Sequence, residues 1–136
     1  MADVDITITD NSGRVKREMA QRKEKAIEIL GLLAERYAKL LCTVDTGRLR
    51  NSITHATSSF PGVGEYEDNH GNRFSDATAN KTPEKYVVYI GTNVEYAPYV
   101  ELGTVRMSAR AFLRPAIADH INEYKDIISK VMKGQL

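Results

Sequence analysis

The spacing of apolar residues changes early in the chain, and the change predicts two different elements. Apolar and polar residues alternate in residues 4–9, VDITIT, as in a strand with one buried face. From about Gly13 to about Leu41 no Pro or other break signal occurs, and in the second half of this stretch apolar residues recur at helical spacing, which predicts a helix. Ser12 stands where a helix cap is expected. A helix of ~28 residues is ~42 Å long, which exceeds the ~30 Å diameter of a small domain. We therefore expect its first half to project or to lie against a neighbouring subunit.

The two halves of this predicted helix differ in chemistry. The first half is polar and rich in cations, which are Arg14, Lys16, Arg17, Arg22, Lys23 and Lys25. The second half carries apolar residues along one broad side, which are Ile27, Leu30, Ala34, Tyr37, Ala38 and Leu41. An amphipathic helix buries its apolar side. The second half is therefore predicted to pack on the core.

A tight turn and a second strand are predicted after the long helix. Asp45, Thr46 and Gly47 interrupt the helical pattern with residues that favour turns. We expect Asp45 or Thr46 to accept local backbone N–H bonds, and Gly47 to have a positive φ or a crowded Cα. The second strand is predicted to begin near Arg50 and to end at about Thr57.

Residues 58–83 differ in kind from the rest of the chain. Gly, Asn, Asp, Ser and Thr dominate, and the apolar residues have no period. This composition predicts a long polar loop that carries little of the domain's stability. The same stretch is also compatible with an irregular hairpin that has residues 69–72 as its turn.

The last third of the chain predicts one strand and two helical segments. Residues 85–91 are rich in aromatic and β-branched residues and form the clearest strand pattern. One or two helical turns are expected in residues 93–102, and a loop or short edge strand in residues 104–112. Pro115 marks the start of a last helix, which Gly134 stops. The apolar stripe of this helix is Ile117, Ile121, Tyr124, Ile128 and Val131.

These elements predict an α+β fold in a single domain of residues 1–136. The order of elements has too few helical crossovers for a parallel sheet. The expected architecture is a small antiparallel sheet of three to four strands, packed with the long N-terminal helix and a C-terminal helix.

Composition narrows the functional classes. The 136 residues include 19 basic and 18 acidic residues, so a globally basic nucleic-acid binder is not favoured. One Cys excludes an intramolecular disulfide, and with three scattered His it leaves no convincing zinc site. No apolar run reaches the ~18–20 residues that span a bilayer, and the acidic N-terminus is unlike a signal peptide. We expect a soluble protein made in the cytoplasm, with no cofactor, no metal and no small-molecule substrate.

Isolated candidates for chemistry have structural explanations. Asp68 and His70, together with His55, have the residue types of a metal-dependent hydrolase or nuclease, but the residues around Asp68 are those of a turn. His55 is interpreted as a structural histidine in a strand. Cys42 follows an apolar helix end and is interpreted as a small core residue. His120 is expected on a solvated or interfacial face.

Five arginines lie near predicted loop–strand junctions, and two hypotheses explain them. The arginines, with Arg48 and Arg50 among them, either pair with Glu95 and Glu101 across protein surfaces or contact phosphates. The phosphate hypothesis adds the basic half of the first helix and describes a nucleic-acid-binding module. The pattern favours protein–protein pairing. The candidate interface residues are Tyr96, Tyr99, Glu101, Arg106, Arg110 and Arg114.

Two segments together resemble a known family. Residues 44–53 read VDTGRLRNSI, residues 89–104 read YIGTNVEYAPYVELGT, and residues 107–116 read MSARAFLRPA. In this order they resemble the small neck or tail-completion proteins of long-tailed bacteriophages, the minor tail-component family named after gene product ten of a lambdoid phage. The sequence departs from that family in residues 58–83, which are longer and more polar, and at Leu102, where Phe is frequent. The turn and structural positions of the motifs are Asp45, Thr46, Gly47, Arg48, Leu49, Gly91, Gly103, Phe112, Leu113 and Pro115.

The resemblance implies a structural role in the virion and no enzyme activity. Such a protein is a subunit of a homo-oligomeric ring around the DNA channel, and it joins the head connector to the tail. Its expected partners are further copies of itself, the neighbouring head-connector and tail proteins, and the DNA nearby in the channel. A ring needs heterologous interfaces that close by rotation. We expect Phe112 and Leu113 to anchor the interface segment to the body of the domain.

Overall fold

The computed structural model describes residues 8–76 and 83–136, and it confirms the predicted α+β fold. The predicted strand in residues 4–9 lies almost entirely outside the described residues. The elements in chain order are α1 (Ser12–Leu41), α2 (Arg48–Ser52), β1 (Thr54–Ala56), β2 (Tyr66–Glu67), β3 (Arg73–Phe74), β4 (Tyr89–Gly91), α3 (Ala97–Leu102), α4 (Leu113–Ala118) and α5 (Ile121–Met132).

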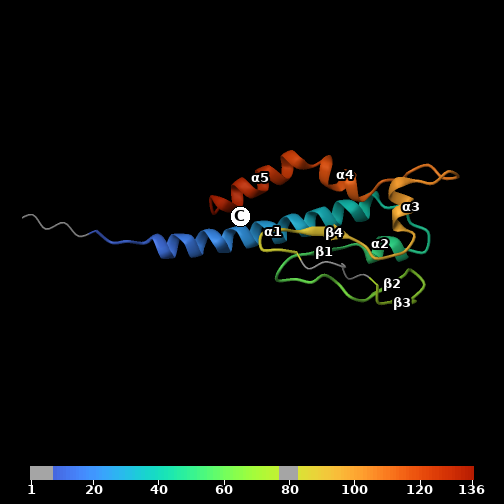
Figure 1. Cartoon of the computed structure of the whole chain (residues 1–136), viewed down its shortest axis with the longest axis horizontal. Coiled ribbons are helices and arrows are strands. Elements are labelled where there is room, and N and C mark those ends of the chain that lie inside the picture. Colours follow the sequence, from blue (N-terminus) through green and yellow to red (C-terminus); the bar gives the residue numbers. More distant parts are fainter. Residues whose placement is uncertain (1–7, 77–82) are drawn as a thin grey trace, which may run out of the picture.

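Helix α1 is the spine of the molecule. Helices α4 and α5 lie along one side of it, and strands β1 and β4 lie along the other (Figure 1). Helix α5 runs back along α1 until Arg22 Nη1 donates to the carbonyl of Met132 at 2.8 Å. The chain before that point, residues 12–19, is exposed throughout. Only the start of the helix, residues 12–19, therefore extends beyond α5, whereas the rest of its first half, from Arg22 on, contacts other parts of the chain.

Small residues let the other elements approach α1. Its buried positions are Ala26, Gly31, Ala34 and Ala38. At Gly31 an added Cβ would lie only 2.6 Å from Cδ2 of His55, so the buried ring of β1 occupies the space that a side chain would need. Large residues reach the same core from the other elements, among them Phe112 and Ile53, which are fully buried. The core is thus formed where small residues of α1 meet large residues from later parts of the chain.

The strands form two antiparallel pairs instead of one sheet. Strand β1 pairs with β4, with His55 opposite Ile90, and β2 pairs with β3, with Tyr66 opposite Phe74. The second pair is a hairpin within residues 58–83, which confirms the hairpin alternative for that segment. Tyr66 is buried in the core, so this part of the segment makes core contacts that a purely polar loop would lack.

The prediction of a strand that begins near Arg50 is wrong about where the strand starts. Residues 48–52 form helix α2, and the strand begins only at Thr54. The apolar residues Leu49 and Ile53 are both buried and stand four apart, which is the spacing of a helical turn. Asn51 N–H donates to the carbonyl of Gly47 at 2.9 Å, so the turn itself starts the helix.

The strand predicted over residues 85–91 is shorter than expected. Only Tyr89–Gly91 pairs with β1, because residues 84–87 form a turn in which Val87 N–H donates to Glu84 at 3.2 Å. Tyr86 has a φ of 64°, an unusual value for a residue that is not glycine. The ammonium group of Lys23, on α1, lies 5.2 Å from the centroid of the Tyr86 ring and holds this turn against the long helix.

The single last helix that the sequence predicts is two helices. Helix α4 has Pro115 in its first turn, and the chain then bends at Asp119 and His120 before α5. The His120 ring stacks on Tyr37 of α1 with centroids 3.7 Å apart, so one face of the ring packs within the chain while the side chain stays 30% exposed. Gly134 ends α5 with a φ of 74°, as predicted.

Candidate functional site

The turn between α1 and α2 has the predicted chemistry. Gly47 has a φ of 84°, and a Cβ there would lie 2.5 Å from Oδ1 of Asn69. Thr46 Oγ1 accepts a hydrogen bond from Arg48 N–H at 3.3 Å, and its carbonyl accepts one from Asn69 N–H at 2.7 Å. Both predictions for this turn are confirmed. The second bond also ties the turn to the β2–β3 hairpin.

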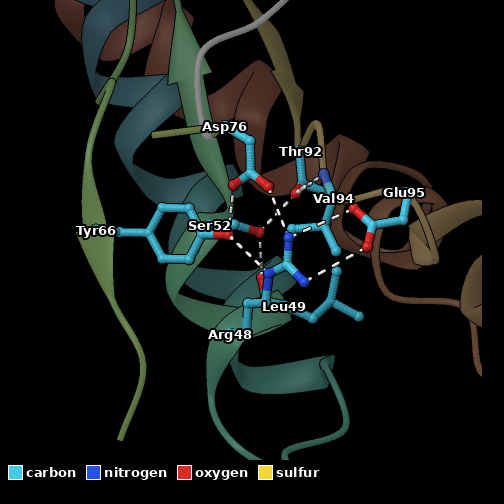
Figure 2. A network of polar contacts seen from close by, with 8 residues as sticks. All are labelled: Arg48, Leu49, Ser52, Tyr66, Asp76, Thr92, Val94 and Glu95. Carbon is cyan, nitrogen blue, oxygen red and sulfur yellow. Dashed lines mark hydrogen bonds and ion pairs between the residues drawn. The ribbon is translucent and has the colours of Figure 1, made fainter. Parts of the chain in front are cut away.

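Arg48 joins three parts of the fold through one guanidinium group. Its Nη2 lies 2.9 Å from Asp76 and 3.4 Å from Glu95, and its Nε donates to the hydroxyl of Tyr66 at 3.4 Å (Figure 2). The guanidinium carbon also lies 4.3 Å from the centroid of the Phe74 ring. The sequence suggested the pairing of an arginine with Glu95, and the structure adds the hairpin. Arg48 therefore acts as an internal clamp between α2, the hairpin and the entrance to α3.

The charges of this clamp stabilise one another. Burial, and after it the hydrogen bond to Asp76, raise the pKa of Tyr66 to about 12. Burial also pushes the pKa of Asp76 upward, but the hydrogen bonds from Tyr66 and Arg48 outweigh it, so that the pKa is lowered. The hydrogen bonds that Arg48 donates, first to the hydroxyl of Tyr66 and second to Asp76, raise the pKa of Arg48. The carboxylate is consequently held ionised against a permanent cation.

A second polar contact lies beneath Arg48 and places α2 against the segment before α3. The hydroxyls of Ser52 and Thr92 are 2.5 Å apart, and Ser52 Oγ also donates to the carbonyl of Leu49 at 2.6 Å (Figure 2). Thr92 Oγ1 accepts a hydrogen bond from Val94 N–H at 3.2 Å, and Val94 is buried. The two family-like motifs thus meet here through short side chains. Gly91 lies at the end of β4, opposite Thr54, with open space around its Cα.

Glu101, in the second family-like motif, caps the start of α4 in its own chain. Its carboxylate accepts backbone N–H bonds from Phe112 at 2.7 Å, Leu113 at 3.0 Å and Arg114 at 2.9 Å. These are donors of the first turn of α4, which has no side-chain cap of its own at Phe112. Partial burial raises the pKa of Glu101, but these three hydrogen bonds outweigh it and lower the pKa overall. The carboxylate is thereby engaged within its own chain.

The last turn of α3 and the loop that follows it form an exposed segment, which we call the tip (residues 99–110). Gly103 has a φ of 80°, and a Cβ there would lie 2.7 Å from the backbone nitrogen of Ala109. The loop is closed by a hydrogen bond from Arg110 N–H to Val100 at 2.8 Å. Apolar side chains nevertheless face solvent on it: Leu102 is 78% exposed and Val105 fully exposed. The tip lies at the end of the molecule away from the start of α1 (Figure 1).

The predicted interface residues divide between these two environments. Tyr99, Arg106, Arg110 and Arg114 are exposed on or beside the tip. Tyr96 is partly buried, with its ring centroid 5.7 Å from the guanidinium of Arg48. A cleft of about 360 Å³ separates the tip from the turn and is lined by residues 43–49, Tyr96, Val100, Met107 and Arg110. Phe112, fully buried, and Leu113, half-buried, anchor the segment as expected.

Sequence reasoning missed Tyr66, Phe74 and Asp76 as members of the site. Two aromatic residues flanking a turn were the available signal, since cross-strand aromatic pairs stabilise hairpins. Their rings lie 5.4 Å apart across β2 and β3. Asp76 carried no signal in the sequence, because its role depends on an arginine 28 residues away.

The residues that suggested metal or nuclease chemistry have other roles. Asp68 accepts hydrogen bonds from the backbone of His70 at 2.8 Å and of Asn72 at 2.9 Å, and thereby forms the hairpin turn. His55 is buried in β1, with Nε2 3.4 Å from Glu28 and Nδ1 3.8 Å from Glu35. Within residues 8–76 and 83–136, no group of three or more His, Cys, Asp or Glu could hold a metal ion.

Cys42 has the predicted core position. Its side chain is buried, and burial raises the pKa of the thiol to about 11. A thiol that is buried and protonated in this way suits a small core residue better than a nucleophile. None of the described helices is long and apolar enough to cross a membrane.

The site thus combines the internal clamp at Arg48, the carboxylate cap of Glu101 on α4 and exposed apolar residues on the tip. Residues 7–103 match the family model described as "Bacteriophage HK97-gp10, putative tail-component". The chain belongs to this HK97-gp10-like family of phage tail components. No curated protein and no solved structure shows significant similarity to it.

Proposed function

We propose that the chain is a structural subunit of a homo-oligomeric ring that joins the head connector to the tail around the DNA channel. The observation that carries the proposal is the tip, where Tyr99, Leu102 and Val105 expose apolar surface at one end of the molecule. Tyr and Arg are enriched in protein interfaces, and Arg106 and Arg110 lie on the same loop. Apolar side chains that are exposed together on one loop are suited to burial against a partner.

The elongated shape supports a head-to-tail ring. The tip lies at one end of the molecule and the projecting start of α1, residues 12–19, at the other (Figure 1). Two different unpartnered surfaces at opposite ends favour heterologous contacts, which close into a ring when the rotation between copies allows it. The remaining exposed surfaces would then meet the head-connector and tail proteins. In this proposal the chain works at the head–tail interface of the virion, is made in the host cytoplasm, and has no catalytic role.

The test is a pair of substitutions on the tip. Leu102→Asp with Val105→Asp removes the apolar contact without touching a buried residue. We expect a folded chain, with heads and tails that form separately and do not join, as seen by electron microscopy. Leu32→Asp, at a position 55% exposed on α1, is the matched control and leaves joining intact. Joined, infectious particles from the tip variant would overturn the proposal.

Contact with DNA is a second candidate, favoured by the exposed basic half of α1. Lys16 and Arg17 carry exposed cations on the part of the helix that projects beyond α5. Binding of duplex DNA by the purified chain would weaken steeply with salt, because phosphate contacts release counterions. Lys16→Glu with Arg17→Glu would reduce this binding and leave the fold unchanged. DNA binding that is insensitive to salt and to these substitutions would exclude the basic half as its source.

A further inference from the structure

A cleft that the proposed function has not used lies at the end of α1. It measures about 430 Å³ and is lined by Glu35, Arg36, Lys39, Leu40, Cys42, Val44 and Arg50. Its lining combines apolar residues with three cations and one carboxylate. Leu40 is 71% exposed and Val44 47% exposed, so apolar surface remains in contact with solvent here. A ligand for this cleft needs apolar side chains together with negative charge.

The cations of the cleft are only partly neutralised by the chain itself. Lys39 forms a long ion pair of 3.9 Å with Glu35, and Arg50 donates to the neutral amides of Asn51 and Asn69. Arg36 forms no ion pair with the described residues. The nearest further carboxylate in sequence is Asp45, which is exposed beside Val44. The cleft therefore keeps a net positive charge.

The start of the chain has the complementary chemistry. Residues 3–8 read DVDITI, in which Asp3 and Asp5 alternate with Val4, Ile6 and Ile8. In an extended segment this alternation places the apolar side chains on one face and the carboxylates on the other. Ile8, the only one of the apolar residues that is described, is 88% exposed. This face therefore has no partner in its own chain at Ile8.

The segment cannot reach the cleft of its own chain. The nearest lining residue, Glu35, is 23 residues along α1 from Ser12 and therefore ~35 Å away. The six residues from Ile6 to Ser12 span at most ~21 Å when fully extended. Any occupation of the cleft by this segment must therefore come from another copy.

We infer that residues 3–8 of one copy bind the cleft at the end of α1 of a second copy. The apolar face covers Leu40 and Val44 inside the cleft, and the carboxylates of Asp3 and Asp5, on the outward face, lie at its rim, where the long side chains of Arg36 and Lys39 reach them. This contact rests on the proposed ring and deepens it. It joins the free end of α1 in one copy to the packed end in the next, which makes the contact heterologous.

The decisive experiment traps the contact between two single-cysteine variants. Ile6→Cys and Val44→Cys are prepared separately, each with Cys42→Ala, and mixed under mild oxidation. A disulfide between them can form only between two copies, and we expect a heterodimer band that a reductant removes. Leu32→Cys replaces Val44→Cys in the matched control, because Leu32 is similarly exposed at 55% but lies outside the cleft. An equal yield with Leu32→Cys, or no heterodimer with Val44→Cys, would overturn the inference.

A charge swap tests the ionic part and separates this inference from the ring. Arg36→Glu with Lys39→Glu should slow trapping about tenfold, because like charges then face one another. Asp3→Lys with Asp5→Lys in the partner should restore the rate, and failure to restore it would contradict the assignment. Thermal unfolding of each variant shows that it is folded. If the tip variant leaves heads and tails unjoined, but no disulfide forms between Ile6→Cys and Val44→Cys, the contact between residues 3–8 and the cleft alone would be overturned. If the disulfide forms, but heads and tails still join when the gene for this chain is deleted, the proposed ring alone would be overturned.

Discussion

The two motifs that characterise this chain use the same residue types in opposite ways. In the first, Arg48 is directed inward, where it contacts Asp76 and Glu95 and lies against Phe74. In the second, Arg106 and Arg110 lie on the exposed tip beside apolar residues that also face solvent. The difference shows that an arginine cluster in a sequence does not define one surface. The first motif stabilises the fold, and the second presents a surface to a partner.

Gly47→Val should have the largest effect on stability and tests the inward motif at its turn. Valine at a φ of 84° is strained, and its side chain would meet Asn69 within 2.5 Å of the Cβ. We expect a loss of about 3 kcal/mol in the free energy of unfolding, measured by urea denaturation. Gly71→Val is the control, because its φ of 81° is similar but no atom lies within 4 Å. Equal losses in the two variants would show that the loss of stability comes from backbone strain alone and not from the contact with Asn69.

Arg48→Met should be the next most damaging change. Methionine keeps the apolar stem but leaves Asp76 and Tyr66 without their cationic partner. We expect a loss of about 2 kcal/mol, together with faster proteolysis in the β2–β3 hairpin. Arg106→Met is the matched variant and should leave both quantities unchanged. If Arg48→Met were as stable as the native chain, the contacts of Arg48 would not stabilise the fold. The distinction between a stabilising first motif and a partner-binding second motif would then be contradicted.

Glu101→Gln sharpens the comparison through pH. The lowered pKa of Glu101 means that its contribution is present above the ordinary value of 4.5 and is lost as the pH falls through the lowered pKa. We expect the variant to lose about 1 kcal/mol at neutral pH, because a neutral amide oxygen accepts more weakly from the start of α4. The difference in stability between native chain and variant should vanish in acid. A difference that stays constant from neutral to acidic pH would contradict the carboxylate cap.

Arg106→Glu with Arg110→Glu should have the smallest effect on the isolated chain. Both side chains are exposed, so the free energy of unfolding should change by less than about 0.5 kcal/mol. Assembly should nevertheless fail, and this is measured as the fraction of heads joined to tails. A strong loss of stability would place these arginines with Arg48 and remove the distinction between the two motifs.

Local patterns in the sequence predicted the elements that need little help from elsewhere. The long helix follows from periodic apolar residues without a Pro, and it ends at Leu41 as predicted. Gly47, Gly103 and Gly134 all have positive φ, so the turn and the ends of two helices were visible in advance. Each of these features depends on residues within a few positions of one another, which is the range that a sequence pattern describes.

Contacts between residues distant in the sequence decided the other features, and the errors in predicting these features have a common cause. A five-residue helix such as α2 is unstable by itself and is formed because Leu49 and Ile53 are buried. The β2–β3 hairpin is too short for independent stability and depends on Arg48. The cap of α4 comes from Glu101, 11 to 13 residues before the donors it binds.

The sequence by itself determined where the backbone can bend and which helix is long. Only the tertiary structure decided which arginine is buried and which side chains remain free for a partner, because burial and ion pairing depend on neighbours that are distant in the sequence.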